Sequence, residues 1–375
     1  MKKNIFVFAL LISLVMSAFG QNESDFQFSE RNGGITITGY TGSVKAVVIP
    51  DSINGLPVVA IGDYVFYDRW NYTGIGLTSV TIPNSVTSIG EFTFSRNQLT
   101  NITLPNSLTS IGNGAFSENQ LTSITLPNSL TTIGKDAFYG NQLTSVTLPN
   151  SLTSIGMHAF DSNQLTNVTF PNSLTFIGQS AFYGNKLTSV VIPNSVTEIG
   201  GYAFAGSIDG SNVGSGNVIR SVTFGNSVIT IGESAFQYNQ LTSVTLPNSL
   251  TTIGKDAFKN NQLTSIVIPN RVTEILRGTF TDNPLVSVTI PESVRKIEDF
   301  AFRLNNSPRT GFTLATIIIG SNVDFGESYN TPFPGNFNQA YSETNRRAGR
   351  YVVVRNGGRN SSGQMLDTWE RAGSQ

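Results

Sequence analysis

The sequence predicts a solenoid of about twelve coils, each 22 residues long, with a parallel β-sheet along one face and short turns or 3-10 segments elsewhere. Three observations predict it. First, only 13% of the residues are charged, and Gly, Asn, Ser and Thr are abundant, which is unusual for a globular domain. Second, an Ile recurs along the chain, and a Phe lies five residues after each copy of it. Third, these Ile residues are 22 apart except for one step of 32: 89, 111, 133, 155, 177, 199, 231, 253, 275 and 297.

The coil at residues 121–142 illustrates the pattern. In Leu121-Thr-Ser-Ile-Thr-Leu126, Ser123 and Thr125 point away from the apolar side, as in a short strand. Pro127 lacks the N–H that would continue a ladder, and residues 130–134 form a second extended piece that ends at a turn. The predicted inward positions are Leu121, Ile124, Leu126, Leu130, Ile133 and Phe138.

One such coil cannot bury its own apolar side, so the core requires stacked coils. The coils begin at residues 44, 77, 99, 121, 143, 165, 187, 219, 241, 263, 285 and 314. We expect an N-terminal cap at 21–43, the solenoid at 44–325 and a C-terminal cap or tail at 326–375. Within the tail, Arg350-Tyr-Val-Val-Val-Arg-Asn-Gly-Gly358 predicts a strand that enters a hairpin turn at Asn-Gly, and Trp369 is expected to pack it down. A docking signal for surface attachment is the alternative for this tail.

The motif LxxIxLPxSLxxIGxxAFxxN resembles the BspA-like, or Treponema pallidum-type, leucine-rich repeat of bacterial surface proteins. Residues 34–39 and 53–57 also resemble the N-terminal segment of that family. The resemblance covers about residues 44–325 and implies a leucine-rich-repeat solenoid that mediates adhesion to host proteins or to other bacteria. Asn stands where many family repeats carry Cys, as at Asn141, and we assign it a structural role because a buried amide must be hydrogen-bonded.

Residues 1–20 have the pattern of a signal peptide. Lys2 and Lys3 precede an apolar stretch from Ile5 to Val15, and Ala18-Phe19-Gly20 offers small residues for cleavage. No later stretch is long and apolar enough to span a bilayer. We therefore expect a secreted or cell-surface protein without an integral membrane segment after signal removal; a periplasmic location stays open.

Several functions are not expected. The 23 basic and 24 acidic residues nearly cancel, so no strong field recruits nucleic acid. The absence of Cys removes thiol nucleophiles and Cys-ligated metals, and the single His158 is expected to be an exposed side chain with no role. With scattered carboxylates and no GxSxG or P-loop, we expect no enzyme and no catalytic, cofactor-binding or metal-binding residues.

The outward strand positions form one candidate binding surface. They carry hydroxyls in nearly every coil, and the candidate contacts are Ser123, Thr125, Ser145, Thr147, Ser243 and Thr245. Folding alone accounts for such residues, because Thr favours strands and small polar groups suit an exposed sheet. As a functional surface, the array would suit the binding of an extended protein or a glycan. Binding of ice is a remote third option.

Three insertions form a second candidate, a binding edge. The usual step from Phe to the next leading aliphatic residue is 5, but it is 11 after Phe66, 15 after Phe204 and 12 after Phe302. Insertions in solenoids emerge on one side, often the binding side. The candidate contacts are Tyr67, Trp70, Tyr72, Asp209 and Asn212. Tolerated loop expansion is the alternative, and a calcium site around Asp209 is disfavoured because it has too few acidic ligands.

Two functions follow from these patterns. The first is a secreted or cell-surface binding protein that adheres to an extracellular or host protein, to a partner bacterial surface or to a glycan. The second is a structural or envelope-associated spacer with no specific ligand.

Overall fold

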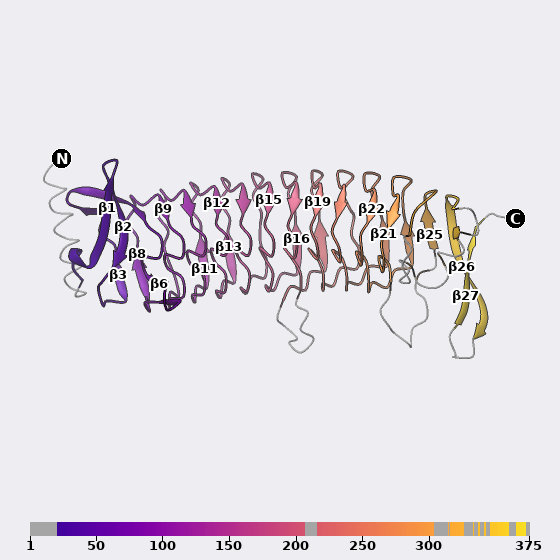
Figure 1. Ribbon diagram of the computed structural model, residues 1–375, viewed down its shortest axis with the longest axis horizontal. Helices are drawn as coiled ribbons and strands as arrows, with labels where there is room; N and C mark the ends of the chain where they lie inside the picture. The colour runs from indigo at the N-terminus through magenta and orange to yellow at the C-terminus, as the bar shows by residue number, and fades with distance from the viewer. Residues whose placement is uncertain are drawn as a thin grey trace. The chain divides into compact units, whose positions relative to one another are not determined.

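The computed structural model describes residues 21–206, 216–303, 314, 316–325, 333, 337, 341–342, 346–359 and 365–372. The chain divides into two compact units, 1–174 and 175–375, which we describe separately. In each unit short strands recur coil after coil (Figure 1). The predicted, mostly β repeat solenoid is confirmed.

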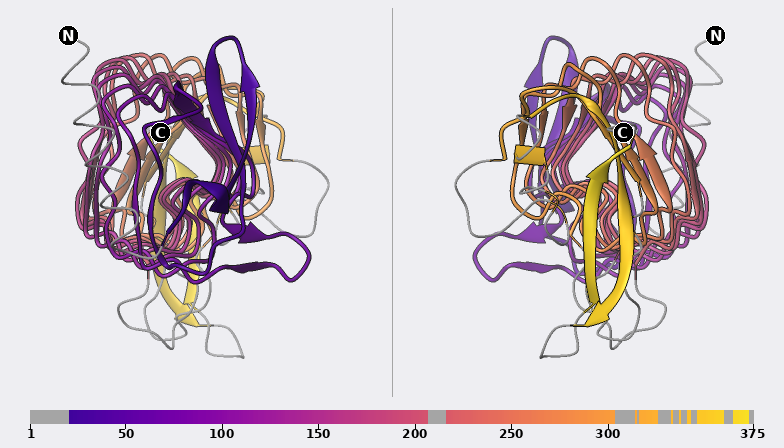
Figure 2. Two further views of the ribbon diagram at one scale, coloured as in Figure 1. Left: turned by 90° about the vertical axis from the view of Figure 1, so that its left-hand side faces the viewer. Right: turned by 90° about the vertical axis from the view of Figure 1, so that its right-hand side faces the viewer.

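Unit 1 begins with a hairpin. A 3-10 turn, η1 (Glu23–Asp25), leads into β1 (Phe26–Arg31), which pairs antiparallel with β2 (Gly34–Tyr40). Strand β2 then pairs parallel with β5 (Leu56–Ile61), and β4 (Ser52–Ile53) pairs antiparallel with β5. Figure 2 shows this hairpin in indigo. The rings of Phe26, Tyr40 and Phe66 follow one another at 5.2 and 5.4 Å, so the hairpin supplies aromatic cover for the first coil.

The most continuous ladder comes from the second extended piece of each coil. In unit 1 it runs parallel from β5 through β9 (Ser88–Ile89), β10 (Ser110–Ile111), β12 (Thr132–Ile133) and β14 (Ser154–Ile155). In unit 2 it comprises β15 (Phe176–Ile177), β17 (Glu198–Ile199), β19 (Thr230–Ile231) and β20 (Thr252–Ile253), with β22 (Glu274–Ile275) and β24 (Lys296–Ile297) as a separate pair. Ile stands over Ile at every step, which fixes the register.

The first extended piece forms shorter parallel groups. These are β3 (Ala46–Val48) with β8 (Ser79–Thr81), β11 (Ser123–Thr125) with β13 (Ser145–Thr147), β16 (Ser189–Val191) with β18 (Ser221–Thr223), and β21 (Ser265–Val267) with β23 (Ser287–Thr289) and β25 (Thr316–Ile319). The coils at 99, 165 and 241 form no strand here. Two of these three coils carry Asn101 and Asn167 at the first outward position, where most coils carry Ser, and Asn is depleted in strands.

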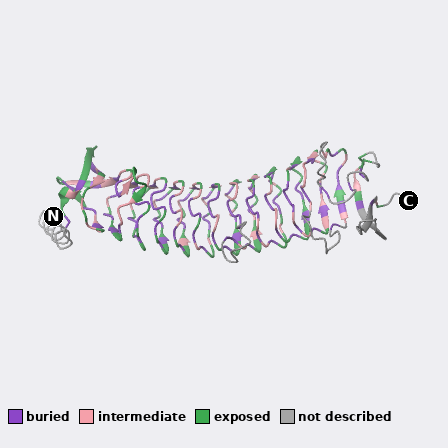
Figure 3. Cartoon of the chain, turned by 60° about the horizontal axis from the view of Figure 1, so that its bottom comes forward, coloured by how far each residue is buried: buried purple, intermediate pink, exposed green. Residues whose placement is uncertain are grey.

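The core lies inside the coils (Figure 3). All six inward positions predicted for the coil at 121–142 are buried, and none is more than 4% exposed. The Phe rings stack from coil to coil. In unit 1 the rings of Phe66, Phe94, Phe116, Phe138 and Phe160 are 5.2–5.5 Å apart. In unit 2, Phe182, Phe204, Phe236, Phe258, Phe280, Phe302 and Phe333 are 4.8–5.7 Å apart.

The Gly that follows the ladder Ile permits close stacking of coils. A Cβ on Gly134 would lie 2.7 Å from the carbonyl carbon and oxygen of Gly112 in the preceding coil. No real Cβ contact is that short, so a side chain here would push the two coils apart. Gly therefore permits this close approach in the coils that carry it, whereas Leu276 and Glu298 stand at the same position in the coils at 263 and 285.

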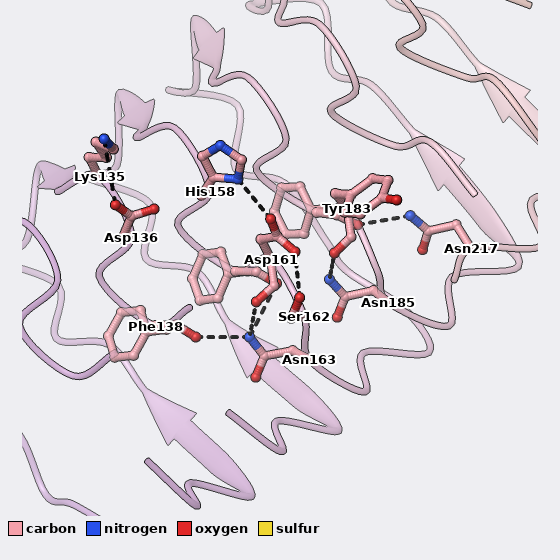
Figure 4. Close-up of polar contacts among 12 residues, drawn as sticks. Lys135, Asp136, Phe138, His158, Asp161, Ser162, Asn163, Tyr183, Asn185 and Asn217 are labelled. Carbon is pink, nitrogen blue, oxygen red and sulfur yellow. Dashed lines mark hydrogen bonds and ion pairs between the residues drawn. The ribbon is translucent and has the colours of Figure 1, made fainter. Parts of the chain in front are cut away.

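The recurring Asn makes a second coil-to-coil connection. Asn141 Oδ1 accepts from the N–H of Leu121 at 3.1 Å, and its Nδ2 donates to the carbonyls of Phe116 at 2.9 Å and of Phe138 at 3.2 Å. Asn163 repeats the bond to Phe138 in the next coil (Figure 4). The side chains of Asn97, Asn119, Asn239, Asn261 and Asn283 do the same in their coils. The predicted structural role of this Asn is confirmed.

The C-terminal segment ends in a β-hairpin. Strand β25 pairs antiparallel with β26 (Gly349–Arg359), and β26 pairs antiparallel with β27 (Met365–Arg371), drawn in yellow in Figure 2. The predicted turn at Asn356-Gly357 is wrong: the register shifts between Arg355 and Arg359, and pairing resumes at Arg359 with Met365. The Asn-Gly pair thus lies at a bulge.

Aromatic residues pack this hairpin against the end of the Phe stack. Trp369 is buried, as predicted, and its ring meets that of Phe337 edge-on at 5.3 Å. Phe337 in turn contacts Phe333, with ring centroids 4.7 Å apart, and Phe333 continues the stack from Phe302. The Tyr341 hydroxyl donates to the Gly320 carbonyl at 2.8 Å. The tail therefore extends the core by stacking aromatic rings without the repeat motif.

We expect the change Asn141→Ala to lower the free energy of unfolding by about 2–4 kcal/mol, because it leaves the buried Leu121 N–H without a partner and removes one of the two side-chain hydrogen bonds to the Phe116 carbonyl. Urea unfolding followed by circular dichroism measures it. The neighbouring Gln142 is exposed, so Gln142→Ala should change stability by less than about 0.5 kcal/mol. Equal urea midpoints for the two variants would contradict a stabilising role for the Asn.

Candidate binding surfaces

The first insertion of unit 1 folds into a small hairpin. Strand β6 (Tyr67–Asp68) pairs antiparallel with β7 (Thr73–Gly74), immediately after the core residue Phe66. We call residues 67–74 the aromatic hairpin. The first predicted insertion is therefore an ordered element that leaves the coil directly after its core Phe.

Asp68 holds the turn of the aromatic hairpin. Its Oδ1 accepts from the N–H groups of Trp70 at 2.9 Å and Asn71 at 3.1 Å, and its Oδ2 accepts from the Asn71 side chain at 2.6 Å. These bonds, chiefly the one from the Asn71 side chain, hold the pKa of Asp68 below its usual range. An aspartate that bonds backbone N–H groups two and three residues on is a common way to fix a tight turn.

Arg96 connects the aromatic hairpin to the repeats. Its Nη1 donates to the carbonyl of Tyr72 at 2.9 Å, and its Nη2 lies 2.9 Å from Glu118 Oε1 in the next coil. The Gly74 N–H also donates to the Arg96 carbonyl at 3.1 Å. The hairpin is therefore fastened to two successive coils.

The aromatic side chains of this region form one surface. The Arg69 guanidinium lies 5.3 Å from the Trp70 ring centroid and 5.5 Å from that of Tyr64. The Tyr64 ring lies 6.0 Å from Tyr67 and stacks on Phe92 at 5.6 Å. Trp70 and Tyr72 are 81% and 66% exposed. Large exposed aromatic groups on a fixed backbone are typical of interface anchors.

The second insertion lies in unit 2 and leaves the repeat undisturbed. Asn217, which follows it, accepts from the Leu187 N–H at 3.0 Å and donates to the Phe182 carbonyl at 2.8 Å, as the other ladder Asn residues do. Phe204 and Phe236 still stack at 5.4 Å. The predicted contacts Asp209 and Asn212, and the third insertion at 304–313, lie outside the described residues.

The hydroxyl positions are exposed as the sequence predicts. On β11 and β13, Ser123 pairs with Ser145, and Thr125 pairs with Thr147, with all four side chains exposed. In unit 2, Ser243 and Thr245 are exposed but belong to a coil without a strand. Val191 and Val267 interrupt the hydroxyls of unit 2 and are 64% and 63% exposed. The structure gives these groups no feature that distinguishes a binding site from an ordinary exposed sheet.

The prediction that His158 is an exposed side chain with no role is wrong. Its Nδ1 lies 2.7 Å from Asp161 Oδ2, and its side chain is about one-third exposed (Figure 4). Asp161 is buried and also accepts from the Ser162 hydroxyl at 2.8 Å. Burial raises the pKa of Asp161 despite these hydrogen bonds. The sequence hides this pair because Asp161 replaces residues such as Tyr139 at the same position of other coils.

Two further features bear on function. Among the described residues, we find no helix with the length and hydropathy that a membrane crossing needs. The same part of the chain contains no group of three His, Cys, Asp or Glu side chains able to hold a metal ion.

A family model for the BspA type leucine rich repeat region matches residues 59–185, 87–211 and 210–326. The chain belongs to this family. The match spans most of the coils in both units, and it confirms the resemblance seen in the repeat motif. A BspA-type repeat region is a fold for interaction with other proteins, so exposed departures from the repeat are the natural places to seek a contact site. A search of curated proteins finds no significant match.

Solved structures of bacterial leucine-rich-repeat proteins are similar to this BspA-type chain. A leucine rich cell surface protein from Faecalibacterium prausnitzii is 25% identical, with a TM-score of 0.42, over 84% of this chain and 98% of that one. The pneumococcal vaccine antigen PcpA is 21% identical, with a TM-score of 0.48, over 81% and 92%. The T. pallidum leucine rich repeat protein is 25% identical, with a TM-score of 0.31, over 64% and 88%.

The raised pKa of Asp161 predicts a pH dependence of stability. Because the folded state binds this proton more tightly than the unfolded chain does, wild-type protein should gain stability relative to Asp161→Asn as the pH falls from neutral towards the ordinary value of 3.8. Urea unfolding of both proteins across this range measures the difference.

The carboxyl groups that both proteins contain contribute equally to the two unfolding free energies, so the difference between these energies reports on Asp161. A difference that shrinks as the pH falls would show that the ion pair with His158 outweighs the burial of Asp161.

Proposed function

We propose that this BspA-type protein is an exported, cell-surface or secreted binding protein that attaches to a protein of a host or of another bacterium through the aromatic hairpin. The observation that carries the proposal is Trp70, which is 81% exposed although its backbone is fixed by Asp68. An aromatic side chain held in one place loses little conformational entropy on binding, so burying it in a partner is strongly favourable.

The chemistry of the hairpin suits a protein partner. Trp, Tyr and Arg are the residues most enriched among interface anchors, and Tyr67, Arg69, Trp70 and Tyr72 supply all three types within six residues. Arg69 lies against both Trp70 and Tyr64, so its guanidinium can meet a carboxylate while the rings contact apolar groups.

We propose a non-catalytic role, with residues 1–20 as the export signal, 21–43 and 326–375 as caps and 44–325 as the repeat region. The reasons are the signal pattern, the absence of Cys from the sequence, and a family of repeat proteins that present surfaces. A spacer without a ligand is the main competing function, and binding through the exposed hydroxyls of β11 and β13 is the main competing site.

The test is binding of the purified protein to immobilised extracellular matrix proteins and to whole cells of co-resident bacteria, measured by biolayer interferometry and cell adherence. Trp70→Ala should weaken binding roughly 30-fold, as expected for the loss of an anchor worth about 2 kcal/mol. Adding Tyr72→Ala should weaken it further. Because both side chains are largely exposed, neither change should lower the thermal unfolding midpoint.

The matched control is Thr125→Ala with Thr147→Ala, which removes two paired hydroxyls from the strand face. This variant should bind as wild-type protein does. Binding lost in the control and kept in the hairpin variant would place the contact on the strand face. No binding to any partner would favour the spacer.

A further inference from the structure

A basic cavity of about 410 Å³ opens on unit 2, whereas the aromatic hairpin belongs to unit 1. Three successive coils build it. Its lining residues are Lys255, Asp256, Lys259, Arg277, Gly278, Thr281, Phe300 and Arg303. A volume of this size lies in the range of pockets that hold small organic ligands, roughly 300–1,000 Å³.

One of the three coils carries no side chain at the corner that lines the cavity. Asp256, Gly278 and Phe300 occupy the same corner of successive coils, two residues after the Ile-Gly position, and all have left-handed backbone with φ of 53°, 68° and 60°. The middle position is Gly, and the Asp256 carboxylate lies where a side chain of that residue would begin. A Cβ there would lie 2.1 Å from Asp256 Oδ1, so the site tolerates no larger residue without a shift.

The charge of the lining is unbalanced. Four cationic side chains face a single carboxylate, that of Asp256, which gives 4 − 1 = 3 positive charges. Asp256 lies 3.6 Å from Lys259, whereas Lys255, Arg277 and Arg303 form no ion pair with any described residue. The whole chain carries a net charge of −1, so this excess is local. Such a concentration of like charge attracts an anion.

The two arginines are held by the ring of Phe300. Their guanidinium carbons lie 5.5 Å (Arg277) and 4.8 Å (Arg303) from its centroid. Contact with an aromatic ring restricts a guanidinium while leaving its N–H groups available, and the planar fork matches a carboxylate or sulfate. The nearby Glu298 does not neutralise them, since its carboxylate accepts from Lys296 at 3.0 Å and from the Arg277 backbone N–H at 3.0 Å.

We propose that this cavity binds an acidic sugar, meaning a hydroxylated ring that carries a carboxylate or a sulfate. The arginines and Lys255 meet the anionic group, and the Asp256 carboxylate accepts hydrogen bonds from ring hydroxyls. A bare inorganic anion gains nothing from Asp256, which repels it. A long nucleic acid requires a basic stripe along many coils, whereas this cluster is confined to three.

The test is isothermal titration calorimetry of the full chain at constant ionic strength with four probes: glucuronate, glucose 6-sulfate, glucose and inorganic sulfate. At least one acidic sugar should bind at least tenfold more tightly than both glucose and sulfate. Glucuronate and glucose 6-sulfate distinguish a carboxylated from a sulfated ligand. Equal affinity for inorganic sulfate and the acidic sugars, or no binding of either acidic sugar, would overturn the proposal.

Two double variants of equal charge locate the site. Arg277→Gln with Arg303→Gln should weaken the binding of the acidic sugar at least tenfold. Arg271→Gln with Arg295→Gln removes two exposed arginines outside the cavity and should leave binding unchanged.

The single change Lys255→Gln, at an exposed side chain that cannot disturb the core, should weaken binding severalfold. Equal affinities for the two double variants would contradict the assignment, and none of these results depends on the aromatic hairpin.

Discussion

A recurring buried Asn hydrogen-bonds its own coil to the coil before it. Asn141 bonds the amide of one coil's leading Leu and the carbonyls of two Phe residues, and those Phe rings stack on one another. A buried backbone group left without a partner costs about 1–3 kcal/mol, and an Asn accordingly stands two residues before each leading residue from Leu99 to Leu285, even after the second insertion. This requirement makes the coils nearly identical and fixes the distance between them.

Because the coils are nearly uniform, the candidate functional sites lie where the repeat pattern changes. The aromatic hairpin is added after Phe66, while the second insertion leaves the stack of Phe204 on Phe236 intact. Gly278 stands at a corner that the neighbouring coils fill with Asp256 and Phe300, and these residues line a charged cavity. Both departures lie outside the Asn and Phe connections, so neither weakens the core.

The sequence predicts what depends on periodicity. The inward set of the coil at 121–142 and the ladder Asn follow from spacing and from the cost of burying polar groups, and the burial of Trp369 follows from the need to cover the last apolar coil. Prediction from the sequence fails where contacts between neighbouring segments determine the structure. His158 looks isolated in the sequence, because its partner Asp161 appears in one coil only. The basic cavity depends on left-handed corners, which non-Gly residues such as Phe300 adopt here without a sequence signal. Asn356-Gly357 falls at a bulge because pairing with β27 continues to Arg359.

Hydrogen exchange at the leading Leu amides tests the coil-to-coil constraint most directly. The N–H groups of Leu99, Leu121, Leu143, Leu241 and Leu263 are each bonded to the Asn near the end of the same coil, and that Asn side chain also donates to the Phe carbonyl of the preceding coil. If these side chains hold the coils together, the five amides should exchange as slowly as those of the Ile ladder, such as Ile133 and Ile253. Exchange at the rate of an unstructured peptide would contradict the account.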